Sequence, residues 1–489
     1  MPSPIRRMAH LRRMVPWLAL VAGVVACSPT PRATAPAPGG SVVQGWITTP
    51  DRRSLLATLP AIPLRAAGAD SGTRIEVDPA QQFQVMDGFG AALTDASAWL
   101  IQTRLSPTQR EALLQALFGR GGTGAGFSFV RVTIGASDFS RSHFTFDDRP
   151  RGQRDESLAH FSIDPHRAEM LPVLKRARAI NPALTIMATP WSAPAWMKTS
   201  DSLYGGTLRP DAFRVYAEYL LKFVEAYAAE GVPVALLSVQ NEPHHEPKDY
   251  PGMRFLPLQR SQFIGEHLGP LLARRAANAR PRILDWDHNW DEAQSPLTVL
   301  HDAVARPFIA GVAWHCYAGE VSAQSVVHDA NPDKDAYFTE CAGGAWAPNF
   351  GDNLRWNVRT LVIGATRHWA RGVALWNLAL DERHGPHLGG CADCRGVVTI
   401  DSAAGAVTFN EEFYALAHAS RFVLPGARRI ASTSGVDDLE SVAFRNPDGQ
   451  LALLLVNSAS TSRTVTVHAA SRSFTTSIAP GAVVTFTWR

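Results

Sequence analysis

The sequence predicts an α/β protein, a (β/α)8 TIM barrel with an associated β-sandwich. Three observations lead to this prediction. Strand-like apolar runs alternate with helix-like segments from residue 85 onward, helical periodicity ends after Leu424, and the remaining residues alternate as antiparallel strands do. With 46% hydrophobic and 19% charged residues, a chain of 489 residues is long and apolar enough to bury both domains.

The catalytic barrel is expected at 85–423. One of its helices begins at Ser106-Pro107, with serine as N-cap and proline at the first helical position. Strand and helix repeated eight times are typical of a closed barrel, and a doubly wound open sheet is the alternative that this pattern leaves open. The strands are expected at 85–91, 127–134, 184–188, 234–239, 282–286, 309–315, 336–339 and 372–376, and later helices at 165–179, 210–229, 259–277 and 354–371.

The β-sandwich is expected mainly from residues 424–489. The segments SVAFRN, LALLLVNS, RTVTVHA and AVVTFTW alternate apolar and polar residues, with turn residues such as Asn446-Pro447-Asp448-Gly449 between them. This region is small for an independent domain. We therefore expect the N-terminal β segment, residues 41–84, to join it.

The first 26 residues have the pattern of an export signal. Four arginines precede the apolar run 15–26, which is too short to span a bilayer. The run ends in Val24-Val25-Ala26-Cys27, which resembles a bacterial lipobox, so Cys27 is expected to be lipidated; cleavage nearby is the alternative. A Pro/Ala-rich tether follows at 27–40. The protein is expected to be exported, as a bacterial lipoprotein of the cell envelope or otherwise as a periplasmic or secreted protein.

The charge of the mature chain argues against a nucleic-acid partner. Removing residues 1–26 deletes four arginines and no acidic residue, so the formal net charge falls from +3 to −1. No basic surplus remains to attract phosphates. Membrane contact is expected only through the lipid anchor.

Two glutamates stand at expected strand ends: Glu242 in SVQNEP after the fourth strand and Glu340 in YFTEC after the seventh. Barrel active sites lie at the C-terminal ends of the strands, and these two ends face one another across the mouth. Paired carboxyls suit glycoside hydrolysis, in which one donates a proton and the other attacks the anomeric carbon or activates water. Either glutamate alone is more often a turn or capping charge. Their joint placement favours catalysis.

Seven motifs occur in order near the expected strand ends: GFGAALTDASA, FVRVTIGASDFS, TPWSAPAWMKT, SVQNEP, WHCYAG, FTECAGG and ALWNLALD. With these motifs the sequence resembles the family 30 glycoside hydrolases, from about Gln84 to the C-terminus. The resemblance implies a retaining β-glycosidase of the glucosylceramidase type. Its substrate would be a β-glucoside, a glycolipid or a glucan, and no metal or organic cofactor is expected.

The resemblance also implies roles for single residues. Glu242 is expected to be the general acid/base and Glu340 the nucleophile of a double displacement, with the carboxyls about 5 Å apart. Arg131 is expected to keep Glu340 ionised, and the charge of Glu340 to keep Glu242 partly protonated. Asn241 is expected to bind the sugar 2-hydroxyl. The other residues expected to bind substrate are Asp95, Trp191 and Trp376 around the glucose and Arg131, His315 and Tyr317 around the nucleophile.

Three of these residues also have structural alternatives. Trp191 and Trp376 suit core packing, because tryptophan is largely buried in most proteins. Asp95 suits an N-cap of the helix that begins DASAWLI.

The cysteines that follow Cys27 predict disulfides in an exported protein. Cys316 follows His315 and Cys341 follows Glu340 on neighbouring strands. Because side chains alternate along a strand, both cysteines should point toward the helix layer, which predicts a Cys316–Cys341 bond; two free buried thiols are the alternative. Cys391 and Cys394 lie in HLGGCADCRG after the eighth strand. They lack the second pair that zinc needs, so a local disulfide is expected.

Other polar clusters are assigned to the substrate rather than to a metal. Asp285, Asp287 and His288 lie at the fifth strand end without metal-ligand spacing, and we expect them to contact sugar. The residues His244, His245 and Glu246 are expected at the rim. The GxGxxG match at 119–124 follows a helix and precedes a strand, which is the reverse of a dinucleotide site.

Two other functions remain open. An endo-β-1,6-glucanase of the same family is the alternative within the enzyme class, since the residues around the glucose serve both activities. A non-catalytic glycan-binding surface lipoprotein is the alternative from another class. The joint presence of Glu242, Glu340, Asn241 and Arg131 argues against a binder, which has no use for a paired acid and nucleophile.

Overall fold

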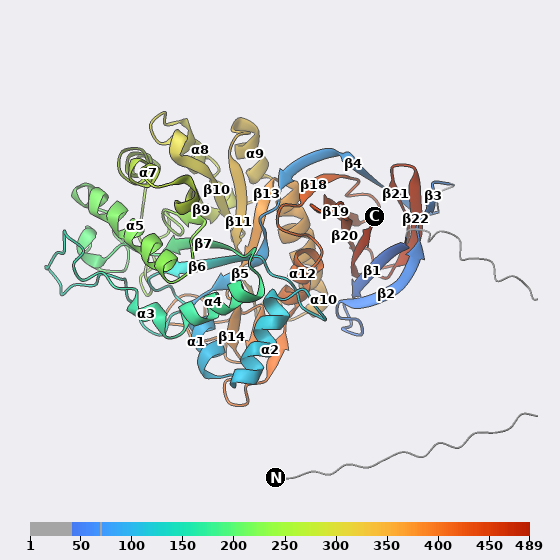
Figure 1. Ribbon diagram of the computed structural model, residues 1–489, viewed down its shortest axis with the longest axis horizontal. Helices are drawn as coiled ribbons and strands as arrows, with labels where there is room; N and C mark the ends of the chain where they lie inside the picture. The colour runs from blue at the N-terminus through green and yellow to red at the C-terminus, as the bar shows by residue number, and fades with distance from the viewer. Residues whose placement is uncertain (1–41, 69–70) are drawn as a thin grey trace, which may run out of the picture. The chain divides into compact units, whose positions relative to one another are not determined.

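The computed structural model describes residues 42–68 and 71–489 (Figure 1). The expected export signal, the tether and Cys27 lie outside these residues. None of the helices within the described ranges combines the length and the hydropathy that a membrane span requires.

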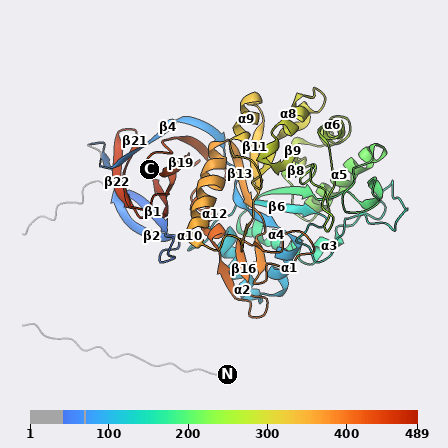
Figure 2. The ribbon, with the colours of Figure 1, turned by 180° about the vertical axis from the view of Figure 1, so that it is seen from behind.

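Eight parallel strands form a closed barrel in the order β10-β11-β13-β5-β6-β7-β8-β9 (Figures 1 and 2). The closed ring confirms the predicted barrel and excludes the open doubly wound sheet. Each strand overlaps one predicted run, and β10 has the predicted bounds. The strands are β5 (Gly88–Leu93), β6 (Phe129–Ile134), β7 (Thr185–Pro190), β8 (Leu236–Ser238), β9 (Arg282–Asn289), β10 (Ile309–His315), β11 (Asp335–Glu340) and β13 (Ala370–Leu375).

An apolar layer fills the barrel interior. Seven strands each contribute one buried side chain to it, namely Phe129, Met187, Leu236, Leu284, Ala313, Tyr337 and Ala374. Because alternate residues of a strand face the interior, the inward positions beyond this layer reach the mouth at the C-terminal strand ends. Arg131, two residues beyond Phe129, is one of these positions.

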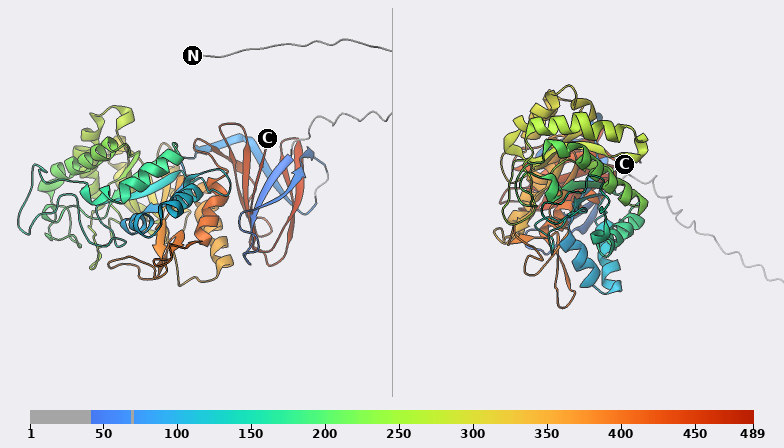
Figure 3. Two further views of the ribbon diagram at one scale, coloured as in Figure 1. Left: turned by 60° about the horizontal axis from the view of Figure 1, so that its bottom comes forward. Right: turned by 90° about the vertical axis from the view of Figure 1, so that its left-hand side faces the viewer.

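Helices follow the strands and surround the barrel (Figure 3). Ser106 caps α2 in a capping box with Gln109, as the sequence predicts. The predicted helix at 165–179 is divided into two, and those at 259–277 and 354–371 contain π-helical segments, Phe263–Leu268 and Asn357–Gly364, which apolar periodicity does not distinguish from α-helix. The α-helices are α1 (Asp95–Thr103), α2 (Pro107–Phe118), α3 (Asp164–Arg167), α4 (Met170–Ile180), α5 (Phe213–Ala229), α6 (Pro257–Gln262), α7 (Gly269–Ala273), α8 (Gln294–His301), α9 (Ala323–Ala330), α10 (Phe350–Trp356), α11 (Ala365–Arg367) and α12 (Glu411–Ser420).

The sandwich is one hydrogen-bonded sheet in the order β2-β1-β23-β20-β19-β18-β4-β21-β22-β3. Contacts between β2 and β22 show that the sheet folds back on itself around its own apolar core. The N-terminal segment is part of it, because β1 pairs with β23 and β4 lies between β18 and β21. The strands are β1 (Val42–Thr48), β2 (Ala57–Pro63), β3 (Arg65–Ala66), β4 (Thr73–Val85), β18 (Arg428–Ser432), β19 (Leu439–Arg445), β20 (Leu451–Asn457), β21 (Arg463–Ala469), β22 (Arg472–Ile478) and β23 (Val483–Trp488).

Two small sheets connect the loops beyond β11 and β13. β12 (Gly343–Gly344) pairs with β15 (Cys394–Arg395), so the segment after Glu340 is tied to the segment that contains Cys394. The second small sheet contains β14 (Ala379–Asp381), β16 (Val398–Ile400) and β17 (Val407–Phe409). Backbone hydrogen bonds in these two sheets therefore hold the loops at the barrel mouth together.

Candidate active site

The two predicted catalytic glutamates both lie at the barrel mouth. Glu340 is the last residue of β11, and Glu242 lies beyond the end of β8. The backbone N–H of Asn241 donates to Pro190 O (2.8 Å), and that of Glu242 donates to Asp287 O (3.0 Å), so this segment is held between β7 and β9. Glu242 has a φ of 47°, a left-handed conformation that is costly for glutamate. The neighbouring strands hold Glu242 in this strained conformation.

His315 relates the two carboxyl groups in space. Its Nδ1 lies 3.1 Å from Oε1 of Glu242 and 3.9 Å from Oε1 of Glu340. These two oxygens are therefore at most about 7 Å apart, which allows the spacing of about 5 Å that retention requires and excludes most of the wider range of inverting enzymes.

Arg131 links the nucleophile candidate to its surroundings. The fully buried guanidinium donates to Glu340 Oε2 (2.5 Å), Asn241 Oδ1 (2.7 Å) and Asp287 Oδ2 (2.9 Å). Because Arg131 can only donate, the oxygen of the Asn241 amide faces it and the NH2 group remains as a donor toward the cavity. A donor there suits a sugar hydroxyl.

A cavity of about 320 Å³ lies between the two glutamates. Trp191 and Trp376 form one wall; their rings stack with centroids 5.2 Å apart and an interplanar angle of 19°. Tyr317 forms another, and its hydroxyl donates to Glu340 Oε1 (2.9 Å). The side chains that line the cavity are those of Asp138, Trp191, Asn241, Glu242, Tyr250, Tyr317, Glu340, Ala342, Trp346, Trp376, Cys391 and Cys394, together with Gly390.

The ionisation of Glu242 differs from the expectation. Burial acts to raise the pKa of its carboxyl, but hydrogen bonds and charges from His288 and His315 outweigh burial and hold this pKa well below its usual range. Burial likewise acts to lower the pKa of His315, yet Glu340, Asp287 and Glu242 raise it to about 9. The expectation that Glu242 is partly protonated is wrong, because His288 and His315 act on Glu242 in addition to the charge of Glu340. At neutral pH the proton between Glu242 and His315 therefore lies on His315.

Within the described ranges, Glu242, His288 and His315 form a cluster of the kind that can hold a metal, with ligand atoms within 4.8 Å of one another. Both ring nitrogens of His315 already have partners, however. Nδ1 contacts Glu242 and Nε2 contacts Asp287 Oδ1, each at 3.1 Å. The arrangement is that of a proton carrier between carboxylates rather than a metal ligand.

The structure does not place Asp95 in the cavity. Its carboxylate accepts from the backbone N–H and the Nε of Arg141 (3.1 and 3.0 Å), and Thr94, not Asp95, caps α1. Besides Glu242 and Glu340, the cavity has a third carboxyl group, that of Asp138, which lies beyond the end of β6 in the motif FVRVTIGASDFS. Burial, with the charges of Glu340 and Glu242, raises the pKa of Asp138 to about 8. Its place after a barrel strand is the signal that could have found it.

The expectation that Asp285, Asp287 and His288 contact sugar is also wrong for the two aspartates. Asp285 is fully buried against Arg260 (2.7 Å), and Asp287 is buried beneath the cavity, where it binds Arg131 and His315. Trp286 and Asp287 have φ values of 75° and 55°, which interrupt the regular alternation of side chains along β9. The hydrophobic periodicity of the sequence does not indicate this interruption.

The predicted rim residues lie outside the cavity. His244 Nδ1 contacts Glu292 Oε2 (2.7 Å), and Glu246 accepts from the backbone N–H of Gly206 (3.1 Å). His245 Nε2 contacts the hydroxyl of Tyr250 (3.0 Å), which itself lines the cavity. His245 is therefore connected to the cavity through Tyr250.

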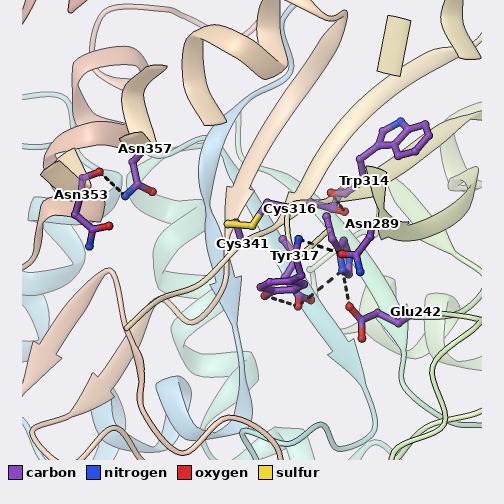
Figure 4. The surroundings of a disulfide bond; sticks show 11 residues. Glu242, Asn289, Trp314, Cys316, Tyr317, Cys341, Asn353 and Asn357 are labelled. Atoms are coloured by element: carbon purple, nitrogen blue, oxygen red, sulfur yellow. Dashed lines mark hydrogen bonds and ion pairs between the residues drawn. A yellow bond between two sulfur atoms is a disulfide. The ribbon is translucent and has the colours of Figure 1, made fainter. Parts of the chain in front are cut away.

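The structure contains both predicted disulfides, Cys316–Cys341 and Cys391–Cys394. Cys316 and Cys341, with Cα atoms 5.4 Å apart, join the segments that follow β10 and β11 beside Tyr317 (Figure 4). Cys391 and Cys394, with Cα atoms 5.7 Å apart, line the catalytic cavity. Both bonds therefore brace the mouth of the barrel.

Comparison with known proteins decides the family. The model of the glycosyl hydrolase family 30 TIM-barrel domain matches residues 86–423, and that of the glycosyl hydrolase family 30 beta sandwich domain matches residues 426–486. This chain belongs to glycosyl hydrolase family 30. It is therefore a glycoside hydrolase with a glycan substrate.

The similar proteins include endo-1,6-beta-glucanases and glucosylceramidases. The chain is 34% identical to an endo-1,6-beta-D-glucanase of Neurospora crassa, over 88% of this chain and 91% of that protein. It is 27% identical to the lysosomal acid glucosylceramidase of Mus musculus, over 90% and 88% respectively. The solved structure of the endo-beta1,6-glucanase BT3312 superposes with a TM-score of 0.84 at 32% identity, covering 91% of this chain and 99% of that one.

Proposed function

We propose that this family 30 enzyme is a retaining endo-β-1,6-glucanase, with Glu340 as nucleophile and Glu242 as acid/base. The observation that carries the mechanism is that the carboxyl groups of Glu242 and Glu340 line one cavity and lie 3.1 and 3.9 Å from the same nitrogen, Nδ1 of His315. The choice of substrate is supported by the higher identity to endo-1,6-beta-glucanases, 34% against 27% for the lysosomal glucosylceramidase. β-1,6-Glucan therefore replaces glucosylceramide, the substrate class first expected.

In the first step the carboxylate of Glu340 attacks the anomeric carbon. Arg131 holds one of its oxygens and Tyr317 the other, so the carboxylate is oriented before substrate arrives. The new bond joins Glu340 to the sugar, and the bond from the anomeric carbon to the glycosidic oxygen breaks. The electron pair stays on the departing oxygen, which takes a proton from Glu242.

His315 supplies that proton to Glu242. The distance between its Nδ1 and Oε1 of Glu242 is 3.1 Å, and Glu340 is one of the charges that raise its pKa. Ester formation at Glu340 neutralises this charge, so the pKa of His315 falls and the proton moves to Glu242 and on to the departing oxygen. In the second step water attacks the anomeric carbon, and the bond from this carbon to Glu340 breaks, which restores the Glu340 carboxylate. Glu242 accepts the water proton, and His315 takes it up again.

The remaining cavity residues hold the sugar. The stacked rings of Trp191 and Trp376 offer apolar surface to its C–H groups, while Asn241 donates to the 2-hydroxyl. The carboxyl group of Asp138, with its raised pKa, can accept from or donate to a hydroxyl group.

Hydrolysis of defined substrates tests the proposal. We expect the purified protein to convert linear β-1,6-glucan into short oligosaccharides whose new reducing ends are β-configured when first formed, as observed by NMR. Glu340→Gln serves as the inactive control. Cleavage of glucosylceramide without cleavage of β-1,6-glucan would return the assignment to the glucosylceramidase type. Inactivity on aryl β-glucosides as well would support the glycan-binding lipoprotein.

We further propose that the protein is exported and lipidated at Cys27, because this cysteine ends an apolar run preceded by arginines. Metabolic labelling with a fatty acid in a bacterial host should label the full-length chain and not the Cys27→Ser variant. Equal labelling of both would contradict lipidation at this residue.

A further inference from the structure

A second cavity adjoins the catalytic one. Its volume is about 650 Å³, against about 320 Å³ for the catalytic cavity, and both values lie in the range of about 300–1,000 Å³ typical of small-molecule sites. The two cavities share Tyr317, Ala342 and Trp346 as walls. A ligand longer than the catalytic cavity can therefore continue into the second one.

Exposed aromatic rings concentrate in this second cavity. Tyr317, Trp346 and Trp356 are 46%, 55% and 43% exposed, and they are three of the four exposed aromatic side chains in the part of the chain that the structure describes. Monomeric proteins seldom leave such rings uncovered in one place without a binding role. Their faces suit the C–H surfaces of sugars.

Polar side chains alternate with the rings. Asn349, Asp352, Asn353 and Asn357 line the same cavity, and Figure 4 shows Asn353 and Asn357 on the far side of the Cys316–Cys341 bond from Glu242. Amide and carboxylate groups match hydroxyl-bearing ligands. A lipid acyl chain would take water from the exposed carboxylate of Asp352 without offering it a hydrogen bond, at a cost in free energy. The lining therefore favours a saccharide.

The position of the cavity indicates which part of a glucan it receives. Asp138 and Trp191 follow β6 and β7, which lie across the ring from β10 and β11, while Trp376 follows β13, which pairs with β11. The second cavity is built beyond β10 and β11, on the other side. In the proposed function the sugar that forms the ester packs against Trp191 and Trp376, so the departing chain extends toward Tyr317 and Trp346.

We propose that this second cavity binds the glucose units of the departing chain, with Trp356 stacking on a unit beyond the reach of the catalytic cavity. The inference rests on the proposed β-1,6-glucanase function and gives it a structural basis for selecting long chains over short glucosides. Trp356 is the informative residue, because it lines the second cavity and not the catalytic one.

The test compares substrates of increasing length in the full chain. We expect the kcat/KM of the unmodified enzyme to rise from an aryl β-glucoside through β-1,6-linked oligosaccharides of two to six glucose units. Trp356→Ala should lower kcat/KM for the longest oligosaccharides roughly tenfold more than for the aryl glucoside, since it removes apolar surface that the sugar covers. Trp356→Phe should retain most of the preference. Leu258→Ala, at a 74% exposed leucine of α6, is the matched control and should leave the length dependence unchanged.

Each outcome is decisive. Thermal unfolding identifies variants that fold poorly, and Trp356→Gln then replaces Trp356→Ala. If the unmodified enzyme cleaves β-1,6-glucan and the variants keep its length dependence, this inference fails while the proposed function stands. If the enzyme cleaves only glucosylceramide and Trp356→Ala impairs that reaction, the cavity receives a lipid chain and both proposals fail.

Discussion

Two ionic networks lie at opposite ends of the barrel interior, separated by the apolar layer that includes Phe129 and Met187. The network at the mouth contains Arg131, Asp287, His315, Glu242 and Glu340. The network at the floor, formed by residues at the strand starts, contains Asp87, Arg282, Asp335, Arg371 and the hydroxyl of Tyr337. Both are built from arginine and carboxylate groups, yet they differ in charge balance.

The floor network is balanced. Arg282 binds Asp87 and Asp335, each at 2.9 Å, and Arg371 binds the same two aspartates at 3.3 and 2.7 Å. Two permanent cations thus face two carboxylates. This network joins the starts of four strands, and it contains no histidine that could take up or release a proton near neutral pH.

The mouth network has more carboxylates than permanent cations. Arg131 is the one arginine facing Asp287, Glu242 and Glu340 in this network, and His315 compensates by taking a proton. Burial and the same negative charge raise the pKa of Asp138 to about 8. The same kinds of ion pair therefore have different consequences in the two networks. At the floor the charges balance and the pairs stabilise the fold, whereas at the mouth the excess of carboxylates keeps a proton on His315.

The largest expected effect comes from Glu340, the proposed nucleophile in the mouth network. Glu340→Gln removes the attacking carboxylate but keeps its size, so kcat/KM on an aryl β-glucoside should fall about 10⁴-fold or more. Sodium azide should not restore the activity. Retention of activity near the unmodified level would refute the assignment.

Glu242→Ala should cost less, about 10²–10⁴-fold, because an aryl leaving group needs little protonation. Azide should restore turnover, since it attacks the glycosyl-enzyme without needing a general base. The expected product is a β-glycosyl azide, detectable by NMR. An α-configured azide would instead identify Glu242 as the nucleophile.

The variant His315→Gln tests whether His315 is protonated in the folded protein. The measurement is the pH dependence of the free energy of unfolding. The pKa of His315 is raised in the folded protein, from 6.5 to about 9, so its contribution is fully present below pH 6.5 and is lost as the pH rises toward 9. For the unmodified protein this predicts a decline in the free energy of unfolding of up to about 3 kcal/mol across that window. Urea unfolding between pH 6 and 9.5 should show a smaller decline for the variant.

Asp138 adds a separate contribution to this profile. Its pKa is also raised in the folded state, from 3.8 to about 8, so its contribution to the decline is nearly complete by pH 8. The interval above pH 8 therefore reports mainly on His315. Identical slopes for both proteins in that interval would contradict a proton stored on His315.

The smallest effect is expected at the floor. Asp87→Asn weakens pairs with two partly exposed arginines, so the free energy of unfolding should fall by about 1–2 kcal/mol while kcat/KM stays unchanged. Urea unfolding and aryl glucoside kinetics measure the two quantities. A large loss of activity at unchanged stability would show that the floor and the mouth are not independent.

Local patterns predicted most of the fold and the identity of the two central glutamates. The eight strands are apolar runs in an alternating series, and the closed barrel brings their C-terminal ends together whatever the loops do. Glu242 and Glu340 could be found because each follows such a run. The strand alternation likewise predicted the Cys316–Cys341 pair, which the structure contains.

The partners of each polar side chain could not be predicted in this way. Arg141 binds Asp95 and Arg260 binds the buried Asp285, whereas Asp138, which was not predicted, lines the cavity. Trp346 and Trp356 lie in the loop and helix that follow β11, where no periodicity reports which way a side chain faces.

The sequence by itself determined which strands form the barrel, which carboxyl groups end them and which cysteines can meet. These follow from periodicities that act over a few residues. Only the tertiary structure decided that His315 carries the proton of Glu242, that Asp138 lines the cavity, and that a second cavity adjoins the first. Burial and charge depend on neighbours that are distant in the chain and close in space, so the chemistry of the mouth is a property of the folded barrel.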